Sequence, residues 1–242
     1  PLALRLVPIA IGLLVVVSGW RHAGDKALWG LWVVAVPSLM WLTWFATPDA
    51  FLLGFWAAGL SFGIRGGRYW LLAGLCAGLA VQSKYSGLWL MPALLLANPS
   101  DLRERWPWMG LGLMGLIAAP NIGWNAAHDW VSLRFAFSEG LNHAHPPGLS
   151  GPLMQIVGQL GVASPILGLL GAAWCVSMTR QIWLGSATRI ERVCWWTSAP
   201  LLVSFALAAL GGPPEAHWPA PAWIGIGLGL SHRTGRWVRV AW

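Results

Sequence analysis

The chain has 242 residues, of which 57% are hydrophobic and only 10% are charged. A soluble domain carries roughly 25% charged residues, so this composition argues against a soluble protein. The formal net charge of +7 does not point to a nucleic-acid partner, because the basic residues lie in short breaks beside apolar runs, where membrane topology and anionic lipids explain them.

Long apolar runs predict an all-α, polytopic transmembrane fold, with residues 1–242 forming one transmembrane domain. About nine membrane spans are expected, at residues 2–18, 28–46, 49–64, 69–83, 85–97, 107–121, 152–177, 194–210 and 218–231. Several are shorter than the roughly 20 residues that a perpendicular helix needs. We expect these short spans to be tilted, or to end at a site within the membrane.

Basic residues fall in every second break between the runs. Twelve of the 15 do so: Arg21, Lys26, Arg65, Arg68, Arg103, Arg105, Arg180, Arg189, Arg192, Arg233, Arg236 and Arg239. This positive-inside pattern predicts cytoplasmic breaks at 19–27, 65–68, 98–106 and 178–193. It places the breaks near 47–48, 84, 122–151 and 211–217 on the outer face.

Two charged residues stand at span ends on the predicted outer face. Asp49 follows Thr47-Pro48, and an acidic group at membrane depth is a functional candidate. It also fits a helix cap, since Pro-Asp is typical of a helix start, and the two roles can coexist. Lys84 is suited to hold a phosphate, with snorkelling at the membrane surface as the structural alternative.

The break at 122–151 is the only long one, and it is rich in aromatic, His and Asn side chains. His128, Asp129 and Arg134 are candidates for binding a substrate, with ordinary loop structure as the alternative. His143 and His145 alternate, but two histidines without a carboxylate at fixed spacing are a weak metal signal. A divalent metal therefore stays open, and no cofactor is assigned.

The last outer break ends in Glu215-Ala216-His217-Trp218-Pro219. Its carboxylate, imidazole and indole face the same compartment as Asp49 and Lys84. Titratable groups that converge on one face predict a site for an anionic or polar ligand. The alternative is a turn capped by Glu215.

The order of these motifs resembles membrane glycosyltransferase family 39, which includes bacterial relatives of protein mannosyltransferases and of the lipid A aminoarabinose transferase. The resemblance lies in Thr47-Pro48-Asp49, in the stretch 67–74, in Gln82-Ser83-Lys84-Tyr85-Ser86, in 121–130, and in His217-Trp218-Pro219. It covers most of the chain.

The resemblance implies a GT-C fold, of which this chain would be a part, and an inverting sugar transfer at the periplasmic face of the bacterial inner membrane. The donor would be a polyprenyl-phosphate sugar and the acceptor a glycan, lipid or protein. Lys84 matches a lysine expected near the donor phosphate, with Tyr85 beside it in the substrate site. Asp49 matches a second acidic position and is the candidate catalytic carboxylate.

A rival hypothesis is a transporter or flippase for a lipid-linked or anionic substrate. Transporters place polar groups at mid-membrane on broken helices, and many are built from internal repeats. Here the polar residues gather at one face, and no internal repeat is evident. The pattern favours the enzyme.

The resemblance also predicts that this chain is inactive by itself. The family's principal catalytic carboxylate lies in an acidic motif of the first outer loop, and no Asp-Glu pair occurs in this chain. We expect no turnover in a transferase assay of the chain, and turnover once the parent's loop is present. Equal rates for the two proteins would contradict this prediction.

Overall fold

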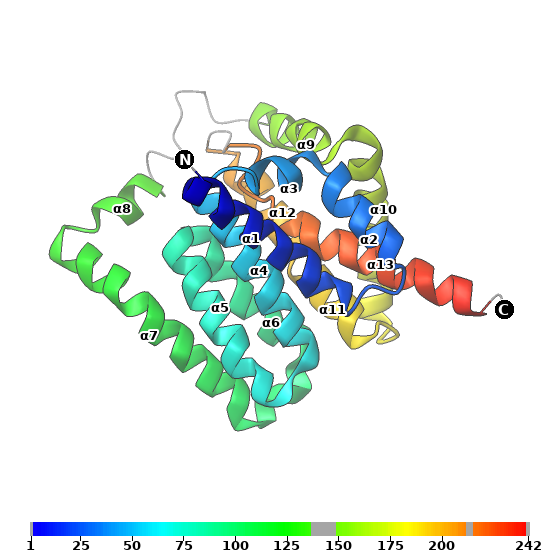
Figure 1. Ribbon diagram of the computed structural model, residues 1–242, viewed down its shortest axis with the longest axis horizontal. Coiled ribbons are helices and arrows are strands. Elements are labelled where there is room, and N and C mark those ends of the chain that lie inside the picture. Colours follow the sequence, from blue (N-terminus) through cyan, green and yellow to red (C-terminus); the bar gives the residue numbers. More distant parts are fainter. Residues whose placement is uncertain (1, 137–148, 212–214, 241–242) are drawn as a thin grey trace.

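A computed structural model describes residues 2–136, 149–211 and 215–240, and these residues form helices and their connections (Figure 1). The α-helices are α1 (Leu2–Trp20), α2 (Lys26–Ala35), α3 (Pro37–Leu42), α4 (Pro48–Arg65), α5 (Trp70–Ser83), α6 (Leu90–Ala97), α7 (Arg105–Ala127), α8 (Val131–Arg134), α9 (Ser150–Ala163), α10 (Pro165–Trp183), α11 (Arg189–Trp196), α12 (Ala199–Ala208) and α13 (Ala222–Val240). Short 3-10 helices cover η1 (Gly67–Tyr69), η2 (Tyr85–Trp89) and η3 (Pro99–Arg103). The predicted all-α class is confirmed for the described residues.

Three predicted spans are not single helices. The run 28–46 is divided between α2 and α3, the run 152–177 between α9 and α10, and the run 194–210 between α11 and α12. Proline stands at the first or second position of each later helix, as Pro37, Pro165 and Pro200. Proline lacks an amide proton and clashes with the preceding turn, so it starts a new helix.

Among the described residues, no single helix is both long and apolar enough to cross a membrane. Taken together, α9 and α10 reach that threshold, but the pair is bent by 115° at Ser164.

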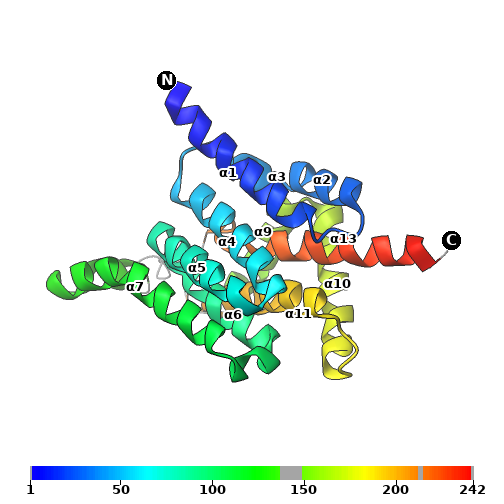
Figure 2. The ribbon, with the colours of Figure 1, turned by 60° about the horizontal axis from the view of Figure 1, so that its bottom comes forward.

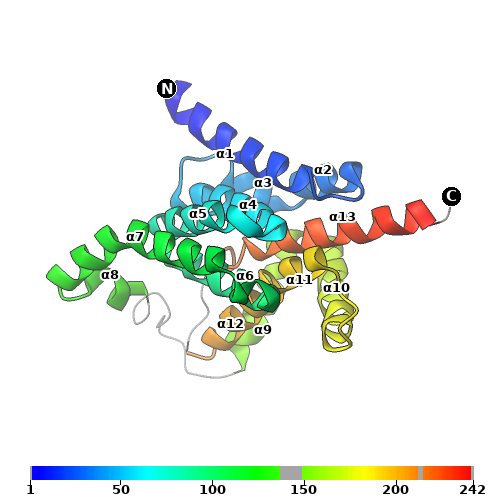
Figure 3. The same cartoon turned by 90° about the horizontal axis from the view of Figure 1, so that it is seen from below.

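Helix α5 lies at the centre of the first half of the chain and packs against both α4 and α7 (Figures 2 and 3). The contact with α7 brings backbone against backbone. A Cβ added to Gly74 would lie 2.0 Å from the Gly110 carbonyl oxygen, and one added to Gly110 would lie 2.3 Å from the Trp70 carbonyl oxygen. Only glycine permits this approach, which holds the start of α5 against α7.

An ion pair joins the two halves of the chain at the predicted cytoplasmic face. Arg189, at the start of α11, donates to both carboxylate oxygens of Asp101 at 2.9 and 2.6 Å and to the Gly63 carbonyl at 3.0 Å. The Trp70 indole also donates to Asp101, at 2.9 Å. Burial raises the pKa of Asp101, but the hydrogen bonds and the charge of Arg189 outweigh it, and the pKa lies below its ordinary value.

These contacts test whether the breaks predicted to be cytoplasmic lie together in the structure. Arg189 and Asp101 come from two of the breaks predicted to be cytoplasmic, and Arg189 also lies against Gly66 in a third. In the break at 19–27, His22 lies 2.9 Å from the Ser61 hydroxyl, one turn before the end of α4. The structure therefore gathers the basic breaks at one end of the bundle.

Arg189→Ala should destabilise the fold. The change leaves the buried Asp101 carboxylate without its cation, at a cost of about 1–3 kcal/mol. For a chain of this size that is a fall in Tm of roughly 2–12 °C. Thermal unfolding in detergent measures it, with Arg103→Ala, an exposed cation two residues after Asp101 in the sequence, as the matched control. Equal melting of the two variants would contradict a structural role for the pair.

Candidate functional site

The candidate site begins at the start of α4, where the sequence sets a helix terminus. The Thr47 side chain caps the helix by accepting a bond from the Ala50 amide at 3.4 Å, and Pro48 occupies the first helical position. The cap is therefore Thr47 and not Asp49. The Asp49 carboxylate is left available for contacts outside its own helix, with 15% of the side chain exposed.

Lys84 reaches this carboxylate from the end of α5. Its backbone is extended, with φ −161° and ψ 143°, between α5 and η2. The Lys84 Nζ atom lies 2.7 Å from Asp49 Oδ1. The turn is tight because the buried Gly87 lies against the end of α5: a Cβ there would be 2.4 Å from the Ala80 carbonyl carbon.

The third part of the site is the turn that leads into α13. His217 Nε2 lies 3.8 Å from Asp49 Oδ2, and Lys84 Nζ lies 5.4 Å from the centre of the Trp218 ring, within cation–π range. Gln159 of α9 holds this turn by donating to the Ala216 carbonyl at 2.7 Å while accepting from an indole of α13 at 3.1 Å. Each Asp49 oxygen thus faces a different cationic or titratable group.

Tyr85 leads into a small polar network with α7. Its hydroxyl donates to Asn121 Oδ1 at 3.2 Å and accepts from Asn125 Nδ2 at 3.0 Å. Asn125 is fully buried and also donates to the Asn121 carbonyl at 3.0 Å. The network fixes the tyrosine ring beside Lys84.

A cavity of about 760 Å³ opens on the Lys84 side of the site. Its apolar walls include Leu88, Trp89, Phe135 and Phe205. Lys84, beside Trp218, supplies a charged group to the lining. The size lies within the range of small-molecule sites, roughly 300–1,000 Å³.

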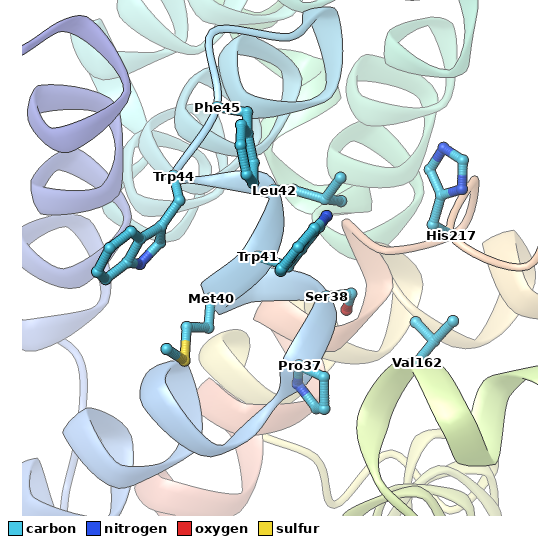
Figure 4. Close-up of a pocket in the computed structure, with 9 residues that line it drawn as sticks. All are labelled: Pro37, Ser38, Met40, Trp41, Leu42, Trp44, Phe45, Val162 and His217. Atoms are coloured by element: carbon cyan, nitrogen blue, oxygen red, sulfur yellow. The ribbon is translucent and has the colours of Figure 1, made fainter. Parts of the chain in front are cut away.

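A second cavity, of about 680 Å³, opens on the His217 side. Figure 4 shows the side chains of α3 and the residues after it on one side, and Val162 of α9 with His217 on the other. Trp41 and Phe45 supply its aromatic walls. The Asp49 cluster therefore borders two cavities of different charge.

The remaining predicted site residues lie at the end of α7, on α8 and at the start of the turn before α13. His128 stacks on the Trp124 ring at 4.3 Å and its Nδ1 lies 2.7 Å from the Trp124 carbonyl, within one helix end. Asp129 is exposed with φ 53°. Arg134 is exposed on α8, and Glu215 is exposed at the start of the turn, where its carbonyl accepts from the Trp218 amide.

The sequence leaves a divalent metal open, and the structure tests this for the described residues. Across the described ranges, no group of three or more His, Cys, Asp or Glu side chains is arranged to hold a metal ion. His143 and His145 lie outside those ranges.

Sequence reasoning missed Trp41 and Phe45, Ser38 and Gln159. The aromatic pair lies within a run that reads as one continuous span, and only the break at Pro37 turns it toward His217. Gln159 is the second of two glutamines in the apolar run at 152–177, and an amide within such a run is the signal that identifies it.

The sequence of the chain is similar to those of known proteins. Residues 2–124, just over half of the chain, match the family described as dolichyl-phosphate-mannose-protein mannosyltransferase. The chain is also 27% identical over 232 residues to a lipid A galacturonosyltransferase of Rhizobium johnstonii, covering 90% of this chain and 48% of the relative. The chain thus spans about half the length of that relative. No solved structure matches it.

Gly87→Ala should dismantle the site. The added methyl group meets backbone atoms of α5 that cannot move independently, so the Lys84 turn must shift. We expect a loss of 2 kcal/mol or more, roughly in line with overpacking of a core. Gly115→Ala, an exposed glycine of α7 with open space around it, is the matched control and should be neutral or stabilising. Thermal unfolding separates the two, and similar Tm values would contradict the tight turn.

Proposed function

The chain belongs to the dolichyl-phosphate-mannose-protein mannosyltransferase family, and we propose that it forms part of a membrane enzyme that transfers a sugar from a polyprenyl-phosphate carrier to an acceptor at the periplasmic face. The sugar is left open. Three parts of the cluster support the proposal: the cation, the carboxylate and the apolar cavity beside them.

The position of Lys84 is the single observation that carries the proposal. A polyprenyl phosphate combines a long hydrocarbon with one anionic group. The cavity of about 760 Å³ offers apolar walls and, at its edge, the Lys84 ammonium. An ammonium is a compact charge suited to a phosphate oxygen, and it would stabilise the charge that develops on the phosphate as the sugar leaves.

Asp49 is proposed to position its neighbours. A carboxylate 2.7 Å from an ammonium fixes the direction in which that ammonium points. Its second oxygen faces His217, which borders the other cavity. A donor phosphate that binds Lys84 would compete with Asp49 for the ammonium, and the carboxylate would then be available to the acceptor side.

The proposed membrane location is supported by side chains that the bundle leaves exposed. Leu13 of α1, and Ile166 and Val176 of α10, are 59%, 73% and 74% exposed. Apolar surface on this scale is typical of contact with lipid. The basic breaks lie together at one end of the bundle and the Asp49 cluster is built from the other breaks, as the positive-inside rule requires.

Broken helices would suit the transporter hypothesis only if they presented polar groups to a substrate. At the bend between α9 and α10, the Ser164 hydroxyl accepts from the Leu167 amide at 3.4 Å and so caps its own helix. Ala163 beside it is fully buried. The bend is therefore satisfied internally, and this favours the transferase.

Lys84→Ala should weaken the binding of an alkyl phosphate such as dodecyl phosphate in detergent-free lipid nanodiscs. Loss of a hydrogen bond to a charged group is worth roughly 1.5–3 kcal/mol, or about 10- to 100-fold in Kd. Lys26→Ala removes an exposed lysine from the opposite face and should leave Kd unchanged. Titration calorimetry measures both.

The single variant also leaves Asp49 without the neighbouring ammonium, so that its charge would repel a phosphate. The double variant Asp49→Asn, Lys84→Ala removes that charge. Weak binding by the double variant supports direct contact between Lys84 and the phosphate. Full recovery of binding, or equal Kd values for Lys84→Ala and Lys26→Ala, would contradict it.

A further inference from the structure

Two arginines at the predicted cytoplasmic end of the bundle converge on one tyrosine. The guanidinium carbon of Arg65 lies 3.5 Å from the centre of the Tyr69 ring, and that of Arg68 lies 5.7 Å from it. Arg65 also donates to the Tyr69 hydroxyl. The Tyr69 ring is itself stacked on Phe62 of α4, with the ring centres 6.3 Å apart and the planes 6° from parallel. Helix α4 therefore holds the ring, and the ring attracts both guanidinium groups.

Two glycines between α4 and η1 allow this convergence. Gly66 and Gly67 have φ angles of 67° and 54°, which residues with a side chain rarely adopt. Gly66 is also buried against Arg189, since a Cβ added there would lie 2.5 Å from a guanidinium nitrogen. The chain therefore turns within two residues, and Arg65 at the end of α4 reaches the same ring as Arg68 in η1.

Among the described residues, no carboxylate forms an ion pair with either arginine. Asp101 lies close to the turn, because a Cβ on Gly66 would be 3.1 Å from its Oδ2 atom, but Arg189 donates to both oxygens of that carboxylate. Two like charges held beside one ring repel each other. An anion that accepts hydrogen bonds from both guanidinium groups would remove this repulsion.

Positive charge extends from this turn to the neighbouring break at 19–27. Burial lowers the pKa of His22, and the charges of Arg65, His232 and Arg21 lower it further. These groups come from the end of α4, from α13 and from the segment after α1. The field at this end of the bundle therefore favours an anion from several elements at once.

Phosphate attached to a lipid is the anion that best fits these surroundings. A guanidinium donates in a planar fork that matches phosphate oxygens, and both Arg65 and Arg68 are exposed. Leu72, 40% exposed, follows Arg68 by four positions along the run of η1 and α5, and so lies near the same face. An acyl chain would cover this leucine, whereas a soluble phosphate would leave it in water.

We propose that Arg65, Arg68 and the Tyr69 ring bind the phosphate headgroup of one anionic phospholipid at the predicted cytoplasmic surface of the membrane. The proposal rests on the proposed membrane location, but not on sugar transfer or on the donor role of Lys84. Helices α4 and α5 are joined by this turn and carry Asp49 and Lys84 at their far ends. The bound lipid therefore stabilises the helix pair on which the candidate site stands.

Native mass spectrometry of the chain, titrated with phosphatidylglycerol in detergent, tests the site. We expect one phosphatidylglycerol to bind about ten-fold more tightly than those that follow it. Arg65→Ala and Arg68→Ala each remove a charge-assisted hydrogen bond and should weaken this first lipid about ten-fold or more in Kd. Arg105→Ala is the matched control, since it removes an exposed guanidinium 4.7 Å from a single ring, that of Trp106, and should leave the first Kd unchanged.

Arg65→Lys separates a built site from general attraction between opposite charges. It keeps the charge but loses the planar fork, so we expect several-fold weaker binding of the first lipid with little change in Tm. A series of lipids of equal affinity, or equal weakening by Arg65→Ala and Arg105→Ala, would mean a diffuse attraction only and would overturn the site.

Soluble probes identify the source of the phosphate. Glycerol phosphate and inorganic phosphate at millimolar concentration should not displace the first phosphatidylglycerol, and the zwitterionic phosphatidylcholine should bind about ten-fold more weakly. Displacement by glycerol phosphate that depends on Arg65 and Arg68 would identify a site for soluble phosphates and would overturn the lipid assignment.

Dodecyl phosphate binding, measured on the same variants, keeps the two proposals apart. Arg65→Ala should leave its Lys84-dependent part unchanged, because the two residues lie at opposite ends of α4 and α5. Specific phosphatidylglycerol binding without Lys84-dependent binding supports the lipid site and overturns the donor role of Lys84. The reverse result overturns the lipid site and leaves the proposed function standing.

Discussion

The ion pair between Lys84 and Asp49 is the contact around which the site is organised. It joins the first turn of α4 to the last residue of α5 at 2.7 Å, in surroundings where only a small part of each side chain is exposed. A partly buried charge is stable only beside an opposite charge, so these two helix ends are held in register. Close glycine contacts hold α5 against α7, and Gly87 packs against the end of α5. These contacts fix the position of the Lys84 turn.

The distribution of charge along the chain predicted the two polar ends of the bundle well. Asp49, Lys84 and His217 are far apart in sequence, yet alternation of apolar runs places all three at one end, and the structure brings them within ion-pair range. The alternative role predicted for Asp49, that of a helix cap, is taken by Thr47. The three residues could be grouped from the sequence because the positions of Arg and Lys between the apolar runs are read from it directly.

Helix continuity was harder to predict. Mean hydropathy over a window does not register a single proline, so the runs at 28–46 and 152–177 read as continuous although Pro37 and Pro165 divide them. One of these divisions also shapes the candidate site. The break before Pro37 turns α3 away from the direction of α2 and brings its aromatic side chains to the cavity beside His217. The part of the site that could not be predicted from the sequence is therefore the aromatic wall that the bend before Pro37 brings to the cavity beside His217.

Two cavities that differ in charge and meet at one carboxylate suit a transfer reaction better than transport. A transported molecule must pass through one continuous path, and a single polar site serves it in both directions. A transfer needs two molecules bound at once, with their reacting groups adjacent and their hydrocarbon parts apart. Lys84 and His217 lie on opposite oxygens of Asp49, and each borders its own apolar space. This arrangement has the geometry that the proposed transfer requires, with two separate spaces that adjoin one carboxylate.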